Sequence, residues 1–299
     1  MTQENNKEDF ELTLFDRLEV IRKTIKEIGE DNCYISFSGG KDSTMLSYLI
    51  DEALHGNNIP RVYINTGIEY NAIVAFVHKM METDKRIVEI KPTLPIKKTL
   101  ETYGYPFKSK EHSCLVAHRN SNAPSIVAYF EGGGTRQTHC PSILMYQYKE
   151  PLPFPISDKC CYKLKKEPVH KWEKENKRHV AILGLKTGEG GQRRTSKGCI
   201  VLQEGKIRKF KPLNPVSDKF EEWYIKTRNI KLCELYYEPY NFKRTGCKGC
   251  PYAIDIADEL DTLERLLPNE RKQCEAIWGK VYDEYRRLGY RLEKALKRS

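Results

Sequence analysis

A short apolar segment, a Gly-Gly turn and the start of a helix follow one another near residue 40. Residues 33–37 are β-rich and apolar, residues 38–43 read Ser-Gly-Gly-Lys-Asp-Ser, and residues 45–50 have the apolar spacing of a helix. Glycines let a backbone approach an anion closely, and a helix start supplies free N–H groups and a positive dipole end. Lys41 adds a charge, and the two serines add hydroxyl groups. The segment therefore predicts a phosphate-binding loop, although it lacks the spacing of a Walker A loop.

The pattern continues as alternating strands and helices. We expect strands at 62–64, 87–90 and 180–183, and a hairpin of 199–203 with 207–210 around Glu-Gly-Lys. Apolar residues at helical spacing predict helices at 11–30, near 73–80 and at 269–290. Strands separated by helices form parallel sheets, so the predicted fold class is α/β, with a mostly parallel twisted sheet flanked by helices.

We divide the chain into three segments. Residues 1–30 form an N-terminal helical segment, and residues 31–230 form a nucleotide-binding α/β domain. That domain contains an insert, residues 104–157, rich in Gly, Pro and Ser and expected to be irregular. Residues 231–299 contain a Cys-x2-Cys motif and C-terminal helices.

Ten cysteines without a recognisable signal peptide indicate a reducing, cytoplasmic location, where cysteines more often bind metal than form disulfides. Cys160 and Cys161 are adjacent, and Cys247 and Cys250 form the Cys-x2-Cys. Taken alone, such a motif fits zinc, redox chemistry or an iron–sulfur cluster. Adjacent cysteines are unusual for zinc, whereas neighbouring thiolates can each bind a different iron of a [4Fe–4S] cluster.

Positive charge is concentrated in one segment. Residues 151–212 contain 16 Lys and Arg against 6 Asp and Glu, which accounts for the whole net charge of +10. Such an excess fits a polyanionic partner such as tRNA or DNA, a multiply charged nucleotide, or equally a solvated basic face. No apolar run is long enough to span a membrane, so we expect no membrane association.

The Ser-Gly-Gly-Lys-Asp-Ser order resembles the PP-loop of the ATP pyrophosphatase (adenine nucleotide alpha-hydrolase) superfamily, whose members cleave the α–β bond of ATP or bind adenylyl sulfate. Val62–Gly67 resembles the second-strand end of the phosphoadenylyl-sulfate (PAPS) reductase-like branch, with Asn65 in place of the usual Asp. Leu183–Arg194 resembles that family's Gly-Ile-Arg-x2-Glu-Ser-x2-Arg segment, with Lys186 in place of Arg.

The resemblance implies the following site residues. Lys41 and Asp42 would be catalytic. The nucleotide would be bound by Ser36, Ser38, Gly39, Gly40, Lys41, Asp42, Ser43, Asn65, Thr66, Gly67, Gly184, Lys186, Glu189 and Arg193.

The cysteine motifs resemble those of adenylyl-sulfate reductases. Lys159–Pro168 is similar to their tandem-Cys motif, and Thr245–Cys250 to their second cluster motif. The resemblance implies a [4Fe–4S] cluster held by Cys160, Cys161, Cys247 and Cys250, with zinc as the alternative.

Two departures favour ATP as substrate, accompanied by Mg²⁺. The loop is the full ATP-type sequence, and no cysteine follows Cys274, whereas reductases of this family carry a nucleophilic Cys in a C-terminal motif. We therefore expect ATP-dependent adenylation and sulfur transfer to a nucleic-acid or small-molecule acceptor, with a sulfur donor such as a cysteine desulfurase. The alternatives are a reductase of adenylyl or phosphoadenylyl sulfate, using Cys114, Cys140, Cys199 or an external thiol, and a non-enzymatic binding protein with a structural cluster.

Overall fold

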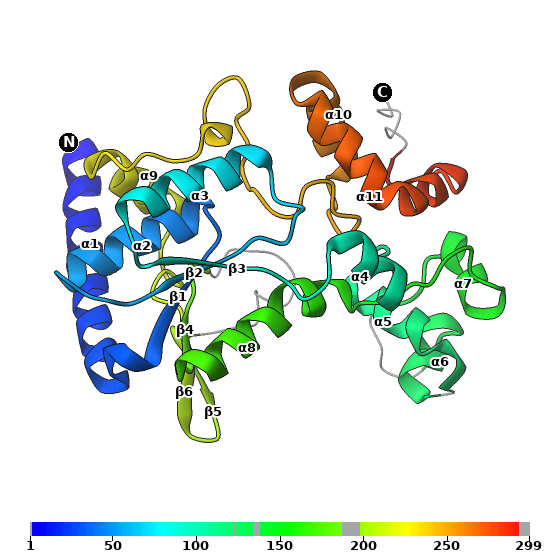
Figure 1. The fold of residues 1–299 in the computed structure, drawn as a ribbon, viewed down its shortest axis with the longest axis horizontal. Coiled ribbons are helices and arrows are strands. Elements are labelled where there is room, and N and C mark those ends of the chain that lie inside the picture. Colours follow the sequence, from blue (N-terminus) through cyan, green and yellow to red (C-terminus); the bar gives the residue numbers. More distant parts are fainter. Residues whose placement is uncertain (1, 122, 134–137, 187–197, 293–299) are drawn as a thin grey trace. The chain divides into compact units, whose positions relative to one another are not determined.

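A mostly parallel sheet is the framework of the chain. The computed structural model describes residues 2–121, 123–133, 138–186 and 198–292, with side chains described from residue 10. Within this part, one sheet has the strand order β3-β2-β1-β4-β6-β5 (Figure 1). Its strands are β1 (Cys33–Phe37), β2 (Arg61–Ile64), β3 (Ile87–Ile90), β4 (Val180–Ile182), β5 (Ile200–Gln203) and β6 (Lys206–Phe210). All neighbouring pairs are parallel except β5 with β6, which form the predicted hairpin.

Helices cover both faces of this sheet. On one face, α1 (Thr2–Ile28), α2 (Lys41–Ala53) and α9 (Asp218–Thr227) bury apolar side chains against β1, β4 and β6 in one core cluster. The helix α8 (Glu167–Asn176) covers the other face (Figure 1), where its Trp172 packs with Tyr34 and Val62. The helix α3 (Asn71–Thr83) connects β2 to β3. The α/β class is thereby confirmed, and α1 begins earlier than the predicted residue 11.

The strand order creates a position suited to ligand binding. The chain runs outward from β1 through β2 to β3, and then returns to place β4 on the other side of β1. In open parallel sheets, ligands bind beyond the carboxyl ends of the strands at such a switch point. Residues 38–43 follow β1 and residues 183–186 follow β4, so both predicted phosphate-binding segments emerge there.

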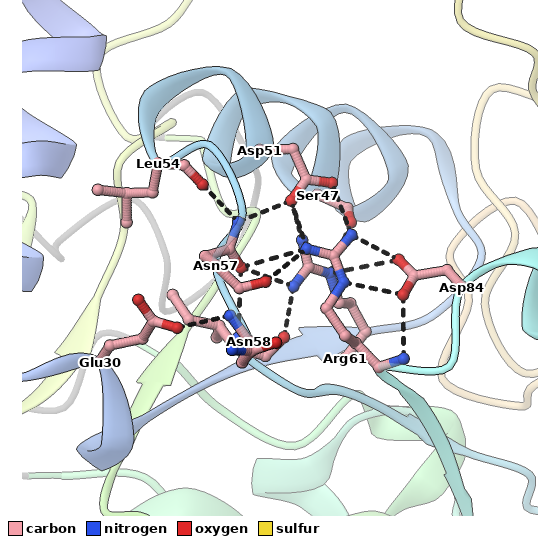
Figure 2. A network of polar contacts seen from close by, with 10 residues as sticks. Glu30, Ser47, Asp51, Leu54, Asn57, Asn58, Arg61 and Asp84 are labelled. Carbon is pink, nitrogen blue, oxygen red and sulfur yellow. Dashed lines mark hydrogen bonds and ion pairs between the residues drawn. The ribbon is translucent and has the colours of Figure 1, made fainter.

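The amino ends of the strands hold a buried polar network instead. Arg61 begins β2 and is fully buried, and its guanidinium donates to Ser47 Oγ at 3.1 Å, Asn57 Oδ1 at 3.0 Å and Asp51 Oδ1 at 2.6 Å (Figure 2). A buried charge is tolerated only when it is paired and hydrogen-bonded. We assign this network to stability, because it lies at the strand ends opposite residues 38–43.

Residues 92–168 and 246–292 are mainly helical. Their elements are α4 (Ile96–Tyr103), α5 (Lys110–Ala117), α6 (Pro124–Phe130), α7 (Tyr146–Lys149), a π-helical turn (Tyr162–Lys166), α10 (Ile256–Leu266) and α11 (Pro268–Arg287). The prediction that 104–157 is irregular was wrong, because α5, α6 and α7 form within it. Their buried aromatic side chains, which include Tyr129 and Phe130, supply a core that Gly and Pro counts do not reveal.

Two compact units divide the chain. The first comprises residues 1–65, 71–91 and 169–245, and the second comprises residues 66–70, 92–168 and 246–299. The predicted boundaries after residues 30 and 230 stay predictions, because compactness does not decide which parts fold alone. Short 3₁₀ turns at Glu30–Asn32, Arg119–Ser121, Ser142–Leu144 and Glu234–Tyr236 complete the elements used below. Among the described residues, no helix has the length and apolarity needed to cross a membrane.

Candidate nucleotide site and cysteine site

The loop after β1 is held by its own hydroxyl groups. The Ser38 backbone N–H donates to Ser43 Oγ at 3.2 Å, and the Gly40 N–H donates to Ser38 Oγ at 3.3 Å. Gly39 has a φ of +70°, and a Cβ on it would lie 2.6 Å from Val77 Cγ2 of α3. Glycine is therefore required there both by the backbone and by the space, and the loop packs closely on α3.

A cavity of about 960 Å³ opens beside this loop. Lys41 and Asp42 line it together with Lys186, which follows β4. Its other lining residues come from the segment before α9, from α9 and from the chain that follows: Asn214, Pro215, Val216, Ser217, Asp218, Glu222, Leu232, Tyr236, Phe242, Lys243 and Arg244. The structure thus brings together, at one cavity, predicted residues from two segments that are about 145 residues apart in sequence.

Two lysines and three carboxylates form the charged floor of this site. Lys186 Nζ lies 2.6 Å from Asp218 Oδ1, 2.6 Å from Glu221 Oε2 and 3.2 Å from Asp42 Oδ1. Lys41 Nζ lies 3.1 Å from the same Glu221 oxygen. Glu221 is fully buried. Because its Oε2 pairs with both Lys41 and Lys186, it holds the two ammonium groups at the bottom of the site.

The pKa shifts follow from this geometry. Burial alone would lower the pKa of Lys186, but its hydrogen bonds to Asp218 and Glu221 outweigh burial and raise it. Burial, followed by the neighbouring Asp42, raises the pKa of Glu221. In the described part of the chain, Asp42 Oδ1 and Glu221 Oε1 are buried and have no hydrogen-bond partner. Asp42 Oδ1 keeps its ion pair with Lys186, so the spare capacity of this floor for a ligand or a cation lies mainly at Glu221 Oε1, because buried acceptors are normally satisfied.

A tyrosine covers part of the loop. The Lys41 backbone N–H donates to the Tyr236 hydroxyl at 3.0 Å, and that oxygen lies 2.6 Å from Thr245 Oγ1. This N–H is one of the orphan donors at the start of α2, the kind of group that binds phosphate at other helix starts.

The remaining predicted nucleotide residues are placed as follows. Ser36 lies in β1, and Gly184 packs so tightly on the loop that a Cβ on it would lie 2.9 Å from the Asp42 carbonyl oxygen. The Asn65 amide donates to Glu89 Oε1 at 3.1 Å. Thr66 and Gly67 belong to the second compact unit, where Glu69 accepts from the Thr66 N–H at 2.9 Å. Glu189 and Arg193 lie outside the described residues.

The four predicted cluster cysteines all lie in the second unit. Burial raises the pKa of Cys160, and the charges of Cys161, Cys247 and Cys250 raise it further. Burial also raises the pKa of Cys247 and of Cys250, and the charge of Cys161 raises both of these pKa values further. The four thiols therefore lie within electrostatic range of one another, although they come from segments 86 residues apart in sequence.

Helices α10 and α11 fix the Cys-x2-Cys turn by its backbone. The Trp278 indole donates to the Lys248 carbonyl at 3.0 Å, and the Tyr285 hydroxyl donates to the Pro251 carbonyl at 2.9 Å. The Gly249 N–H in turn donates to Glu259 Oε1 of α10 at 2.9 Å. The buried Lys248 ammonium pairs with Glu270. In the described part of the chain, no three His, Cys, Asp or Glu side chains converge tightly enough for one metal ion.

Sequence reasoning did not select Glu221 or Tyr236 as site residues. The signal for Glu221 was its spacing, since Asp218 and Glu221 are three apart at the start of a helix and share one face. Tyr236 had no comparable signal, because its role depends on a contact with a residue 195 positions away.

Comparison with known proteins gives one family. The family model of the phosphoadenosine phosphosulfate reductase domain matches residues 32–122 and 127–253. None of the curated proteins matches the chain.

Three solved structures are similar to the chain at low sequence identity. A PAPS reductase from Candida auris in complex with phosphate has 15% identity and a TM-score of 0.42, over 77% of this chain and 93% of that chain. An NH3-dependent NAD synthetase from Campylobacter jejuni in complex with nitrate has 12% identity and a TM-score of 0.41, over 91% of this chain and 95% of that chain. A U34-tRNA thiolase from Methanococcus maripaludis with its [4Fe–4S] cluster has 15% identity and a TM-score of 0.35, over 94% of this chain and 80% of that chain.

Proposed function

The chain belongs to the phosphoadenosine phosphosulfate reductase family, and from this premise we propose that it is an enzyme that uses ATP to adenylate an acceptor and replaces the AMP with sulfur. The observation that carries the proposal is the cavity at the switch point of the sheet. There the fixed loop and two lysines, Lys41 and Lys186, face one volume large enough for a nucleotide.

The charges of this floor suit a triphosphate. A helix start and two ammonium groups attract phosphate oxygens, and Glu221 would release Lys41 and Lys186 to them as the nucleotide enters. In the described part of the chain, Glu221 Oε1 is a carboxylate oxygen without a hydrogen-bond partner, and Asp42 Oδ1 has only its ion pair with Lys186. Oxygen ligands of this kind are what Mg²⁺ prefers, so these two residues would hold the ion.

The chemistry balances without an added oxidant. An acceptor oxygen attacks the α-phosphorus of ATP, the α–β bond breaks, and pyrophosphate leaves. Sulfur at the oxidation level of sulfide then attacks the adenylated carbon, and AMP leaves with the oxygen. Lys41 and Lys186 stabilise the negative charge that builds up on the phosphate oxygens in the first step.

Cys160, Cys161, Cys247 and Cys250 fit a [4Fe–4S] cluster. They are mutually close and backed by a rigid turn, and the Cys247 thiol is hydrogen-bonded by Lys165, an interaction that favours the thiolate. A [4Fe–4S] cluster spreads its four thiolates over four irons, so its ligands need not converge as tightly as those of one zinc ion. When bound, it would supply iron at which sulfide can coordinate.

The partners follow from the same proposal. An adenine nucleotide binds the cavity, a protein such as a cysteine desulfurase supplies the sulfur, and the acceptor is a tRNA, a DNA or a small molecule. Part of segment 151–212 presents charge to solvent for a polyanion, including Lys171 and Lys174 on α8. We place the reaction in the cytoplasm.

The test is made with full-length protein purified without oxygen. Calorimetry should show preferential binding of ATP over phosphoadenylyl sulfate, and turnover with an acceptor should release AMP and pyrophosphate. Lys41→Ala should abolish this release, whereas Lys219→Ala, an exposed lysine of α9 outside the cavity lining, should not. Unchanged turnover in Lys41→Ala would exclude the proposal.

A second candidate is reduction of adenylyl or phosphoadenylyl sulfate to sulfite, and the matched family model favours it. It would use an external thiol or one of the loop cysteines. Preferential binding of the sulfonucleotide and release of sulfite with thioredoxin would replace the first proposal by this one. Tight nucleotide binding without any turnover would instead favour a binding protein with a structural cluster.

A further inference from the structure

We propose that the chain segment 235–244, named here the 235–244 turn, binds an unpaired stretch of a single-stranded nucleic acid beside the nucleotide cavity. This inference rests on the proposed function and deepens it, because it names the class of acceptor and the residues that receive it. It also adds a contact point outside the basic segment 151–212.

The turn is rigid before any ligand arrives. The Phe242 N–H donates to the Leu235 carbonyl at 2.8 Å and closes the turn. Inside it, the Tyr240 and Asn241 N–H groups donate to the Tyr237 carbonyl at 2.9 and 3.0 Å. A surface that is ordered in advance loses little conformational entropy on binding.

Tyr237 presents its ring to solvent from this rigid support. The side chain is 48% exposed, and its hydroxyl accepts a hydrogen bond from the Leu232 N–H at 3.1 Å. This hydrogen bond fixes the hydroxyl end of the side chain and so holds the ring in its exposed position. A fixed, exposed aromatic face is what a nucleic-acid base stacks on, and this preference tolerates any base sequence.

The same turn supplies positive charge next to the cavity. Phe242, Lys243 and Arg244 line the same cavity as Lys41 and Lys186, and the Lys243 side chain is exposed. The lysines on the floor suit the phosphates of the nucleotide, whereas this wall combines an aromatic ring with cations. An aromatic platform beside cations suits a strand with both bases and phosphates.

A duplex does not fit the same features. Stacking on Tyr237 requires a base with a free face, and duplex bases are stacked on their neighbours. The geometry therefore favours a loop, a bulge or a single strand over a paired helix.

Fluorescence anisotropy with labelled oligonucleotides tests the proposal on the full-length protein purified without oxygen. The probes are one mixed sequence as single-stranded RNA, as single-stranded DNA and as the two duplexes. We expect single strands to bind more tightly than duplexes, and the RNA and DNA arms identify which sugar is preferred. Tyr237→Ala should weaken single-strand binding about 5- to 100-fold. Tyr237→Phe keeps the aromatic ring and should retain most of the wild-type affinity. Lys243→Ala should lower the slope of affinity against salt by about one.

Tyr48→Ala is the matched control, because Tyr48 is 41% exposed but lies on α2 and is not among the residues that line the cavity. Equal losses in Tyr48→Ala and Tyr237→Ala, or duplexes binding as tightly as single strands, would overturn the proposal. So would an equal loss of ATP affinity in Tyr237→Ala, because the ring would then belong to the nucleotide site. If the wild type binds single strands but neither binds nor cleaves ATP, the proposed function fails while this inference stands.

Discussion

The backbone N–H of Lys41 donates a 3.0 Å hydrogen bond to the hydroxyl of Tyr236, 195 residues further along the chain. In the same protein, the Lys41 side chain is paired with Glu221. Two groups that would bind a phosphate are therefore occupied by a neutral hydroxyl and a carboxylate. A nucleotide must displace both of them to reach the loop.

Tyr236→Phe removes one of these competitors. Without the hydroxyl, the Lys41 N–H keeps its orientation and has no partner to give up, so ATP affinity should rise about 2- to 10-fold, the worth of one ordinary hydrogen bond. Calorimetric titration of ATP measures the change. Thr245→Ser is the control, because it retains a hydroxyl beside Tyr236 and should leave the affinity unchanged. A fall in affinity in Tyr236→Phe would mean that the hydroxyl supports the ATP-bound loop instead.

Gly184→Ala tests how closely the segment after β4 packs on the phosphate loop. The added Cβ would lie 2.9 Å from the Asp42 carbonyl oxygen and 3.3 Å from the Ser43 nitrogen. Both neighbours are backbone atoms, which cannot swing aside, so the loop must shift. Overpacking of this kind costs about 1–3 kcal/mol, and we expect ATP affinity to fall about 5- to 150-fold.

Gly279→Ala is the control for this substitution, because a Cβ there meets no atom within 4 Å and the residue lies in α11. It should leave ATP affinity unchanged and slightly stabilise the helix. Equal ATP affinities of Gly184→Ala and wild type would show that the loop adapts without cost.

The Cys-x2-Cys turn offers a matched pair of glycines. Gly249 has a φ of +61°, and a Cβ on it would lie 2.8 Å from Cys274 Sγ and closer still to the Tyr282 hydroxyl. Gly246, one residue before Cys247, has nothing within 4 Å of the same added atom. Gly249→Ala should therefore distort the turn and reduce bound iron from about four atoms per chain towards zero, whereas Gly246→Ala should retain it. Iron and sulfide analysis after anaerobic reconstitution measures both variants, and equal iron contents would contradict the expectation.

Local pattern predicted much of the framework. Residues 33–37 and 87–90 form strands with the predicted bounds, because a short strand needs only a run of apolar, β-branched or aromatic side chains. The loop of residues 38–43 followed from its glycines and its place between strand and helix. These features depend on neighbours in sequence, so the sequence alone indicates them.

Features that depend on distant contacts were less accessible. The helices in 104–157 depend on buried side chains such as His112, Tyr129 and Gln147, which satisfy one another only after folding. Glu221 and Tyr236 acquire their roles from Lys41, which lies in another element. Even where spacing places such a residue on a helix face, as for Glu221, its pairing partner is determined by the tertiary fold.

The buried His112 makes the stability of the helical insert depend on pH. Its Nε2 lies 2.7 Å from Gln147 Oε1, and its Nδ1 lies 2.9 Å from the Tyr129 hydroxyl. Burial, opposed by the hydrogen bond to Gln147 and assisted by the charges of Lys108 and Arg291, lowers the pKa of His112 from 6.5 to about 4. The folded state therefore binds fewer protons than the unfolded state between these two pH values. Stability should be fully present above pH 6.5 and fall as the pH is lowered towards 4, by about 3 kcal/mol in total.

Hydrogen exchange of the α5 and α6 amides measures this free energy of opening as a function of pH. Because carboxylates elsewhere also titrate as the pH falls, the informative quantity is the difference between wild type and His112→Gln, which keeps a polar side chain but cannot take up a proton. The variant should lose the decline between pH 6.5 and 4 that belongs to His112. His55→Gln, at an exposed position of the other compact unit, should retain it. If His112→Gln and wild type decline in parallel, the imidazole is protonated in the folded state and its burial does not control the pH response.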